Sequence, residues 1–188
     1  QRSLVGSEMC IRDRYMLIFQ LDAYVFRDEL LDWARQGYDY IGAPWLPEQM
    51  EGKIGNSKYL LLKRFFYRLI NSPKLRRWKY FTYEVGNGGF SLRNITKMIA
   101  ITHKYKDKIT QWLDDAKPFY PEDVLLFVEI REKQYRLRTP RYDKALQFSM
   151  EVGAEWAFDY NKRRLPFGCH AWYHEEYYPF WSRLIEKY

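Results

Sequence analysis

Acidic residues stand at two places where the surrounding sequence could give them a chemical role. Asp22 follows the apolar run Tyr15–Leu21, which predicts a buried β-strand with a carboxylate at its carboxyl end. In open α/β sheets, this edge is where ligands bind. Glu122 and Asp123 follow Pro121 in the first turn of a predicted helix. A carboxylate there could act as a general base, and it also favours a helix N-terminus by its charge alone.

A glycine-rich segment, 85–91, has the sequence VGNGGFS and leads into a predicted short strand. Glycines permit positive φ and close approach of the backbone to a ligand, and Asn87 can donate and accept hydrogen bonds. An ordinary tight turn is the alternative. Arg93, at the end of this strand, could reach a phosphate or face solvent. Trp45 could stack on a sugar face or lie in the core.

Three histidines complete the set of residues that could do chemistry. His170 follows the segment PFGC, and a single histidine in such a place is more often a structural residue than a metal ligand. We expect His174 to lie at the surface. His103 falls on the face of a predicted helix, and nothing near it in the sequence supports a functional role.

The elements that must position these residues alternate between strands and helices, which predicts the α/β class. The helix after Asn94 has this residue as a plausible N-cap, and a short helix over Glu29–Arg35 ends before Gly37. A final helix begins at Pro179 and buries Phe180, Trp181, Leu184 and Ile185. The other predicted elements are strands at Tyr15–Leu21, Tyr38–Ile41, Gln147–Val152 and Leu165–Cys169, a short strand before Asn94 and a helix from Pro121.

Length and composition fit one soluble domain with a single core. The chain has 188 residues, of which 47% are hydrophobic and 29% charged, and its net charge of +7 indicates an anionic partner. No apolar run approaches the roughly 18 residues of a membrane-spanning helix. Segment 52–79 has nine Lys or Arg and no Asp or Glu, and Ser57–Ile70 within it predicts a basic amphipathic helix. That helix is either a solvated face or a contact with an anionic glycan or membrane surface.

The first 14 residues differ in origin from the rest in our interpretation. Leu4–Asp13 reads LVGSEMCIRD, which matches one reading frame of a common transposase sequencing adapter, and Arg14 fits its last bases. We therefore expect residues 1–14 to be a non-native tail and 15–188 to be the C-terminal part of one domain. Cys10 is then foreign and Cys169 is the native cysteine. A genuine unstructured N-terminal tail is the alternative.

Four segments taken together resemble one family. They are IFQLDAYVF with DYIGAPW, then VGNGGFSLR, then PEDVLLF, then LPFGCHAWYHEE. In order and spacing they are similar to a family of uncharacterised, predicted glycosyltransferases of the GT-A superfamily, over essentially all of Tyr15–Tyr188. The resemblance implies an α/β, GT-A-like nucleotide-diphospho-sugar transferase fold, here without its N-terminal strand–helix units. The chain as given is therefore expected to be inactive by itself.

The resemblance also implies a reaction and its residues. A sugar would pass from a nucleotide-sugar donor to a glycan or lipid-linked acceptor, by inversion, with Mn²⁺ or Mg²⁺ neutralising the departing diphosphate. Asp22 stands where GT-A enzymes usually have an Asp-x-Asp motif, although the second acid is absent, and His170 matches a late histidine ligand. Asp123 is favoured as the base, with Glu122 structural or acceptor-binding, because adjacent helical residues point about 100° apart. The implied substrate-binding residues are Gln20, Trp45, Asn87, Gly88, Gly89 and Arg93.

Two other function classes remain open at this point. One is a glycan-binding relative that kept the fold without the chemistry. The other is a basic nucleic-acid-binding module, although no known binding motif occurs and the acidic residues cluster where catalysis would need them. We therefore expect no nucleic-acid partner. The expected location is the cytoplasm, with peripheral membrane contact through segment 52–79.

Overall fold

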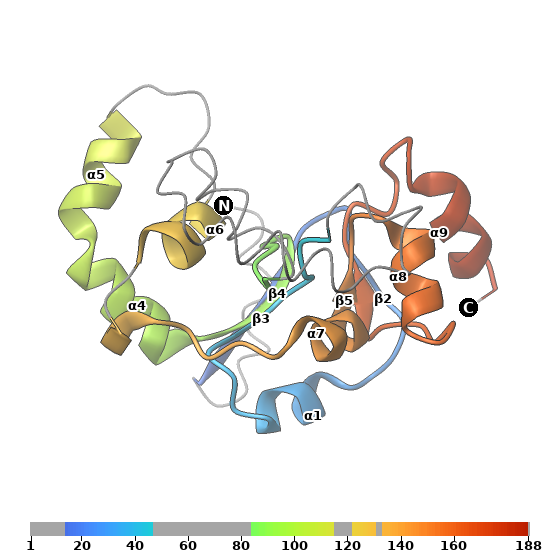
Figure 1. Cartoon of the computed structure of the whole chain (residues 1–188), viewed down its shortest axis with the longest axis horizontal. Helices are drawn as coiled ribbons and strands as arrows, with labels where there is room; N and C mark the ends of the chain where they lie inside the picture. Colours follow the sequence, from blue (N-terminus) through green and yellow to red (C-terminus); the bar gives the residue numbers. More distant parts are fainter. Residues whose placement is uncertain (1–13, 47–83, 115–121, 131–132, 188) are drawn as a thin grey trace, which may run out of the picture.

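The computed structural model describes residues 14–46, 84–114, 122–130 and 133–187 (Figure 1). It has a mixed α/β architecture, with two small sheets in the middle of the molecule. Helices α4, α5 and α6 lie at one side in Figure 1, and α8 and α9 lie at the other. The predicted basic helix Ser57–Ile70, the rest of segment 52–79 and the tail 1–13 fall outside the described residues.

The first sheet is antiparallel and has the strand order β1-β4-β3. Its strands are β1 (Tyr15–Phe19), β3 (Tyr40–Ile41) and β4 (Phe90–Asn94). The sequence predicts a buried strand up to Leu21, and this is wrong in two respects. The strand ends at Phe19, and Leu21 is 94% exposed. The reason is that β1 lies at one end of the strand order, so its apolar side chains are only partly covered.

The second sheet determines where the candidate site residues lie. Its strands are β2 (Tyr24–Val25), β5 (Ser149–Met150) and β6 (Gly168–Cys169). β5 runs parallel to β6, and β2 runs antiparallel to β6. The residues that follow β5 and β6 therefore lie at the same end of the sheet as the residues that precede β2. We call this end, with Asp22, Glu151 and His170, the His170 end. The opposite end of the sheet, where residues precede β5 and β6 and follow β2, is the Arg27 end.

The helices mostly follow the sequence predictions. α1 spans Leu30–Arg35 and is followed by Gly37 at φ 71°, the left-handed conformation that glycine adopts without strain. α4 spans Ile95–Lys104 and begins after Asn94, as predicted. The predicted strand Gln147–Val152 is shorter than expected because α7 continues through Phe148. The remaining helical elements are α5 (Lys106–Asp114), α6 (Glu122–Val124), a π-helical turn η4 (Leu125–Glu129), a 3₁₀ turn η5 (Lys133–Tyr135), α7 (Tyr142–Phe148), α8 (Ala154–Tyr160) and α9 (Tyr178–Ile185).

The N-cap of α4 gives a first testable prediction. The Asn94 side chain accepts a hydrogen bond from the Lys97 backbone N–H at 3.1 Å. Asn94→Ala removes this acceptor and should lower the free energy of unfolding by about 1 kcal/mol, measured by urea denaturation. Thr96→Ala, an exposed change in the same helical turn, is the control. An equal loss in both variants would mean that the cap contributes nothing of its own.

The cores are rich in aromatic rings, which accounts for many of the aromatic residues in the sequence. Phe90 stacks on Phe148, with ring centroids 5.3 Å apart, and joins the first sheet to α7. Trp181 of α9 is fully buried and contacts Phe26 and Phe180. Burial raises the pKa of the Cys169 thiol well above its usual range, so this cysteine stays neutral.

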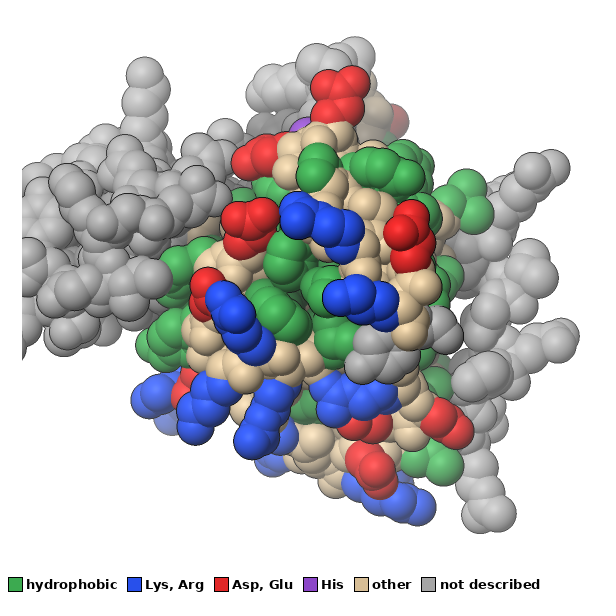
Figure 2. All heavy atoms as spheres, turned by 90° about the vertical axis from the view of Figure 1, so that its right-hand side faces the viewer, with side chains coloured by type: hydrophobic (Ala, Val, Ile, Leu, Met, Phe, Trp, Pro, Cys, Tyr) green, Lys and Arg blue, Asp and Glu red, His purple; other side chains and the backbone are tan. Residues whose placement is uncertain are grey.

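The surface beside α8 and α9 carries apolar side chains in its middle and charged ones around them (Figure 2). A hollow of 320 Å³ here is lined by Phe158, Phe180 and Leu184, with Arg163 and Arg183 among its charged residues. Among the helices that the structure describes, none has the length and hydropathy needed to cross a membrane.

Candidate functional site

The glycine-rich loop 86–89 brings the separate candidate residues together. The backbone N–H of Gln20 donates to the Gly89 carbonyl at 3.0 Å, next to the β1–β4 pairing. On its other side, the N–H groups of Gly86 and Asn87 donate to the Ala43 carbonyl. Residues 20–22 and residues 43–45 therefore flank the loop, although the chain places them far apart.

His170 forms the centre of one half of the site. Its Nε2 lies 2.9 Å from Gln20 Oε1 and 3.1 Å from Asp22 Oδ1. Its Nδ1 lies 2.9 Å from Glu151 Oε2, in a charge contact whose angle is not that of a hydrogen bond. The ring is thus held between two carboxylates at the His170 end of the second sheet. We call Gln20, Asp22, Glu151 and His170 the His170 cluster.

The charge of the His170 cluster depends on two opposing effects. Burial lowers the pKa of His170, but the carboxylates of Glu151 and Asp22 raise it more, so the pKa lies above its ordinary value. When the ring is protonated, its charge neutralises one of the two carboxylates. The Nε2 atom, which faces Asp22 and Gln20, is the nitrogen at which a proton and a cation would compete.

Glu151 is a member of this cluster that the sequence does not predict. It follows β5, whose two residues are too short for a clear strand signal, and it reaches His170 because β5 and β6 are parallel. A carboxylate on one imidazole nitrogen fixes the ring orientation and leaves the other nitrogen to bind a ligand. The expected strand over Gln147–Val152 was the only signal that could have pointed to Glu151.

Gly89 is required at its position because the His170 ring occupies the space of a side chain. A Cβ atom added to Gly89 would lie 2.0 Å from His170 Nε2 and 2.4 Å from its Cδ2. Any larger residue must therefore displace the imidazole or the loop. The glycine that the sequence marks for close backbone approach makes that approach to His170 within the protein.

The second half of the site is an ion pair between Arg93 and Glu122. The Arg93 guanidinium is nearly buried and donates to Glu122 Oε1 at 2.5 Å and to the Gly88 carbonyl at 3.2 Å. It also donates to Ser91 Oγ at 3.0 Å and lies over the ring of Tyr40. Arg93 is therefore fully engaged inside the protein, where it ties α6 to the glycine loop.

The Tyr40 hydroxyl group contacts the backbone of the glycine loop. The hydroxyl oxygen lies 3.0 Å from both the Gly86 and the Asn87 carbonyl oxygens. Burial raises the pKa of Tyr40 to about 12, against the opposing charge of Arg93, so the phenol keeps its proton. A neutral hydroxyl can donate to these carbonyls, whereas a phenolate would repel them.

Arg93 and Glu122 are predicted to contribute unequally to the stability of the protein. Arg93→Ala removes a buried guanidinium that donates to Ser91 Oγ and to the Gly88 carbonyl, which then keeps only its hydrogen bond from Ser91, and should lower the free energy of unfolding by about 2 kcal/mol. Glu122→Ala should lower the free energy of unfolding by less than about 1 kcal/mol, because the Glu122 side chain is 59% exposed and water screens its ion pair. Urea denaturation of both variants tests this difference. Equal losses would mean that the ion pair, and not the burial of Arg93, determines the stability.

Trp45 and Asn87 complete the surroundings of the loop. A Cβ atom on Gly86 would lie 2.0 Å from the Trp45 ring, so the ring packs directly on the loop backbone. The same ring meets the edge of Phe127 at 5.8 Å. Asn87 is buried, and its Nδ2 has no hydrogen-bond partner among the described residues. A buried amide donor without a partner is uncommon in a folded protein and marks this position for a water or ligand contact.

The predicted site residues thus fall into two neighbouring groups on one loop. Gln20, Asp22, Gly89 and His170 form one group, and Gly88, Arg93 and Glu122 form the other. Asp123 is half-buried, and its charge acts on Tyr40 beneath the loop. His103 and His174 are exposed and lie apart from both groups, as the sequence predicts for His174.

The comparisons with known proteins define a family. The family model described as "Protein of unknown function (DUF5672)" matches residues 8–170, a range that begins within the predicted tail and ends at His170. The chain belongs to this family. The matched range contains every candidate site residue from Gln20 to His170. A search of the curated proteins and a search of the solved structures each found no match.

The donor atoms of the His170 cluster are of the types that small divalent cations accept. Asp22 and Gln20 offer oxygen atoms and His170 an imidazole nitrogen, a set that Mn²⁺ accepts. Ligands at roughly 2.1 Å in an octahedral shell lie about 3 Å apart, which agrees with the two Nε2 contacts. In the described parts of the chain, no group of three or more His, Cys, Asp and Glu side chains could hold a metal. The two carboxylates contact opposite nitrogens of one ring, so only Asp22 shares the Nε2 face.

Proposed function

We propose that this protein is a metal-assisted glycosyltransferase with a GT-A-like fold. It would move a sugar from a nucleotide-sugar donor to a glycan or lipid-linked acceptor. The observation that carries the proposal is the convergence of Gln20, Asp22 and His170 beside Gly89 of the glycine loop. Carboxylate, amide and imidazole groups beside a glycine-rich loop suit the binding of a diphosphate through a cation.

Each residue of the His170 cluster has a distinct part in this proposal. Asp22 and His170 would hold Mn²⁺ or Mg²⁺, with Gln20 as a further oxygen donor. Glu151 holds the His170 ring with Nε2 toward Asp22. A bound cation would supply charge neutralisation on the leaving diphosphate. The Asn87 amide, which has no hydrogen-bond partner among the described residues, would bind a donor or acceptor hydroxyl at the loop.

The reaction would be a single displacement at the anomeric carbon. The acceptor hydroxyl oxygen forms the new bond to this carbon, and the bond to the diphosphate oxygen breaks, with its electron pair leaving on the nucleotide. Asp123 would take the proton of the attacking hydroxyl. Glu122 has one oxygen committed to Arg93, so its part is to fix α6 against the loop and to contact the acceptor.

The test is metal-dependent binding of nucleotide sugars. The protein is titrated with UDP-glucose and GDP-mannose with and without Mn²⁺. We expect Mn²⁺ to raise the affinity for one of them by about tenfold or more, and Asp22→Ala or His170→Ala to remove that rise. Asp28→Ala and His174→Ala change the same residue types at exposed positions and serve as matched controls.

Two results would contradict the proposal. Binding that ignores Mn²⁺ and both cluster variants would leave a glycan-binding role without catalysis. Tight binding of nucleic acid that weakens steeply with salt would favour the basic binding module instead.

A further inference from the structure

A second pocket lies at the Arg27 end of the second sheet, opposite the His170 end. Its volume of 590 Å³ is within the range of about 300–1,000 Å³ that small-molecule sites occupy. Gln147 precedes β5, Leu165 precedes β6 and Arg27 follows β2, so the sheet separates this pocket from the His170 cluster. The other lining residues come from α1, α7 and the turn after α8: Glu29, Asp32, Trp33, Gln36, Asp143, Lys144, Tyr160, Asn161, Lys162 and Arg164.

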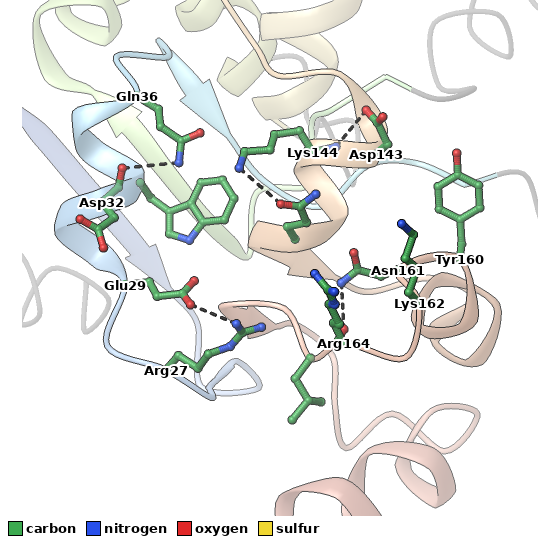
Figure 3. A pocket seen from close by; sticks show the side chains of 13 residues that line it. Arg27, Glu29, Asp32, Gln36, Asp143, Lys144, Tyr160, Asn161, Lys162 and Arg164 are labelled. Carbon is green, nitrogen blue, oxygen red and sulfur yellow. Dashed lines mark hydrogen bonds and ion pairs between the residues drawn. The ribbon is translucent and has the colours of Figure 1, made fainter.

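The pocket has positive charge that the protein does not neutralise. Each of its carboxylates already has an arginine partner: Glu29 pairs with Arg27, Asp32 with Arg35 and Asp143 with Arg141. Within the described parts of the chain, the Lys144 ammonium contacts the Trp33 ring and Gln147 and no carboxylate. Among the described residues, Lys162 and Arg164 have no carboxylate at ion-pair distance. Figure 3 shows Arg27 and Arg164 at two sides of the pocket, on different segments of the chain. Three uncompensated cations favour an anionic ligand.

The turn that presents Lys162 and Arg164 has a strained backbone. Lys162 and Arg163 have φ values of 59° and 54°, in the left-handed region that side chains rarely adopt. The turn is held by Asn161, whose side-chain amide donates to the Arg164 carbonyl at 2.8 Å. Such strain persists only where the surrounding structure imposes it, and it concentrates at ligand sites.

The aromatic rings of the pocket offer little surface on which a nucleotide base could stack. Trp33 is 4% exposed, and its ring is covered by Lys144 and Phe148. Tyr160 is 39% exposed, but one face of its ring stacks on Trp156 at 5.1 Å, and its hydroxyl lies 3.1 Å from the Tyr142 hydroxyl. Amide groups of Gln36, Gln147 and Asn161 line the same space and suit hydroxyl groups.

We propose that this pocket binds an anionic saccharide, a small sugar that carries a phosphate or a carboxylate. Lys162, Arg164 and Lys144 neutralise its anionic group, and the amide side chains bind its hydroxyls. This site is independent of the proposed transfer reaction, because it lies at the other end of the sheet and shares no residue with the His170 cluster.

The experiment is calorimetric titration of the full chain with glucose 6-phosphate and glucuronate as probes. Glucose, inorganic phosphate and UMP are the comparison ligands. We expect glucose 6-phosphate or glucuronate to bind, and the tighter of the two identifies the anion that the pocket prefers. Glucose, which lacks the anionic group, should bind about tenfold or more weakly than that probe. Lys162→Gln and Arg164→Gln should each lower the affinity by about tenfold. Arg163→Gln, the matched control, should change it less than twofold because Arg163 pairs with Asp159 away from the pocket.

Three outcomes would overturn the proposal. UMP binding tighter than either anionic sugar would indicate a nucleotide site. An equal loss in Arg163→Gln would indicate attraction to net charge without a built site. A loss in Asp22→Ala would place the bound sugar at the His170 cluster, whereas an unchanged affinity in that variant separates this site from the proposed transferase site.

Discussion

Gly89→Ala is expected to remove the metal-dependent rise of about tenfold or more in nucleotide-sugar affinity, and to lower the free energy of unfolding by about 3 kcal/mol. The reason is the 2.0 Å separation between an added Cβ and His170 Nε2. The ring cannot stay in place, and its displacement separates Nε2 from Asp22 and Gln20. Titration with Mn²⁺ and urea denaturation measure the two effects on the same preparation.

A double-mutant cycle identifies the cause of this loss. In a His170→Ala background, the atoms that would clash with the new Cβ are gone, because the nearest atoms to it all belong to the imidazole ring. In that background, Gly89→Ala should lower the free energy of unfolding by less than about 0.5 kcal/mol. The coupling energy between the two positions would then account for nearly all of the loss seen in Gly89→Ala alone. A cost that is the same in both backgrounds would show that the loop backbone, and not the histidine, excludes a side chain.

Asp123→Asn is expected to reduce sugar transfer by about 10²–10⁴-fold and to leave donor affinity unchanged. The amide has nearly the shape of the carboxylate but cannot take the proton of the attacking hydroxyl. Steady-state kinetics with the donor identified by titration measures the turnover. This prediction also distinguishes an enzyme from a glycan-binding relative. A glycan-binding relative would bind its ligand in both forms but would show no turnover in either.

Glu122→Gln is the matched control, because the two acids are adjacent in α6 and differ in their partners. Glu122 Oε1 is occupied by the Arg93 guanidinium, so the change should weaken the ion pair and reduce turnover only mildly. A larger loss in Glu122→Gln than in Asp123→Asn would reverse the two roles. The base would then be the residue that Arg93 orients.

The sequence was most informative where a local rule decides the structure. Asn94 caps α4 and Gly37 takes a left-handed conformation after α1, because capping and positive φ depend on a few neighbouring residues. The glycine loop was recognisable for the same reason. The chain belongs to the mixed α/β class that the alternation of elements predicts, whereas the GT-A-like arrangement remains a proposal.

Pairing between distant segments could not be read from the sequence. The apolar run Tyr15–Leu21 gives no sign that β1 lies at one end of an antiparallel sheet, where Leu21 is exposed. Strands of two residues carry no periodicity, so neither the β5–β6 pairing nor the position of Glu151 was predictable. The sequence left Arg93 either to reach a phosphate or to face solvent, and the second alternative is wrong because tertiary packing buries Arg93 against Tyr40 and Glu122.

The contact between His170 and Gln20 joins residues that are 150 positions apart in the chain. A protein emerging from the ribosome folds its earlier segments first, and contacts of long sequence separation form last. The glycine loop and its Arg93–Glu122 ion pair can assemble once α6 has emerged. The nitrogen that the proposed cation would bind arrives only with His170, so every shorter nascent chain lacks that ligand.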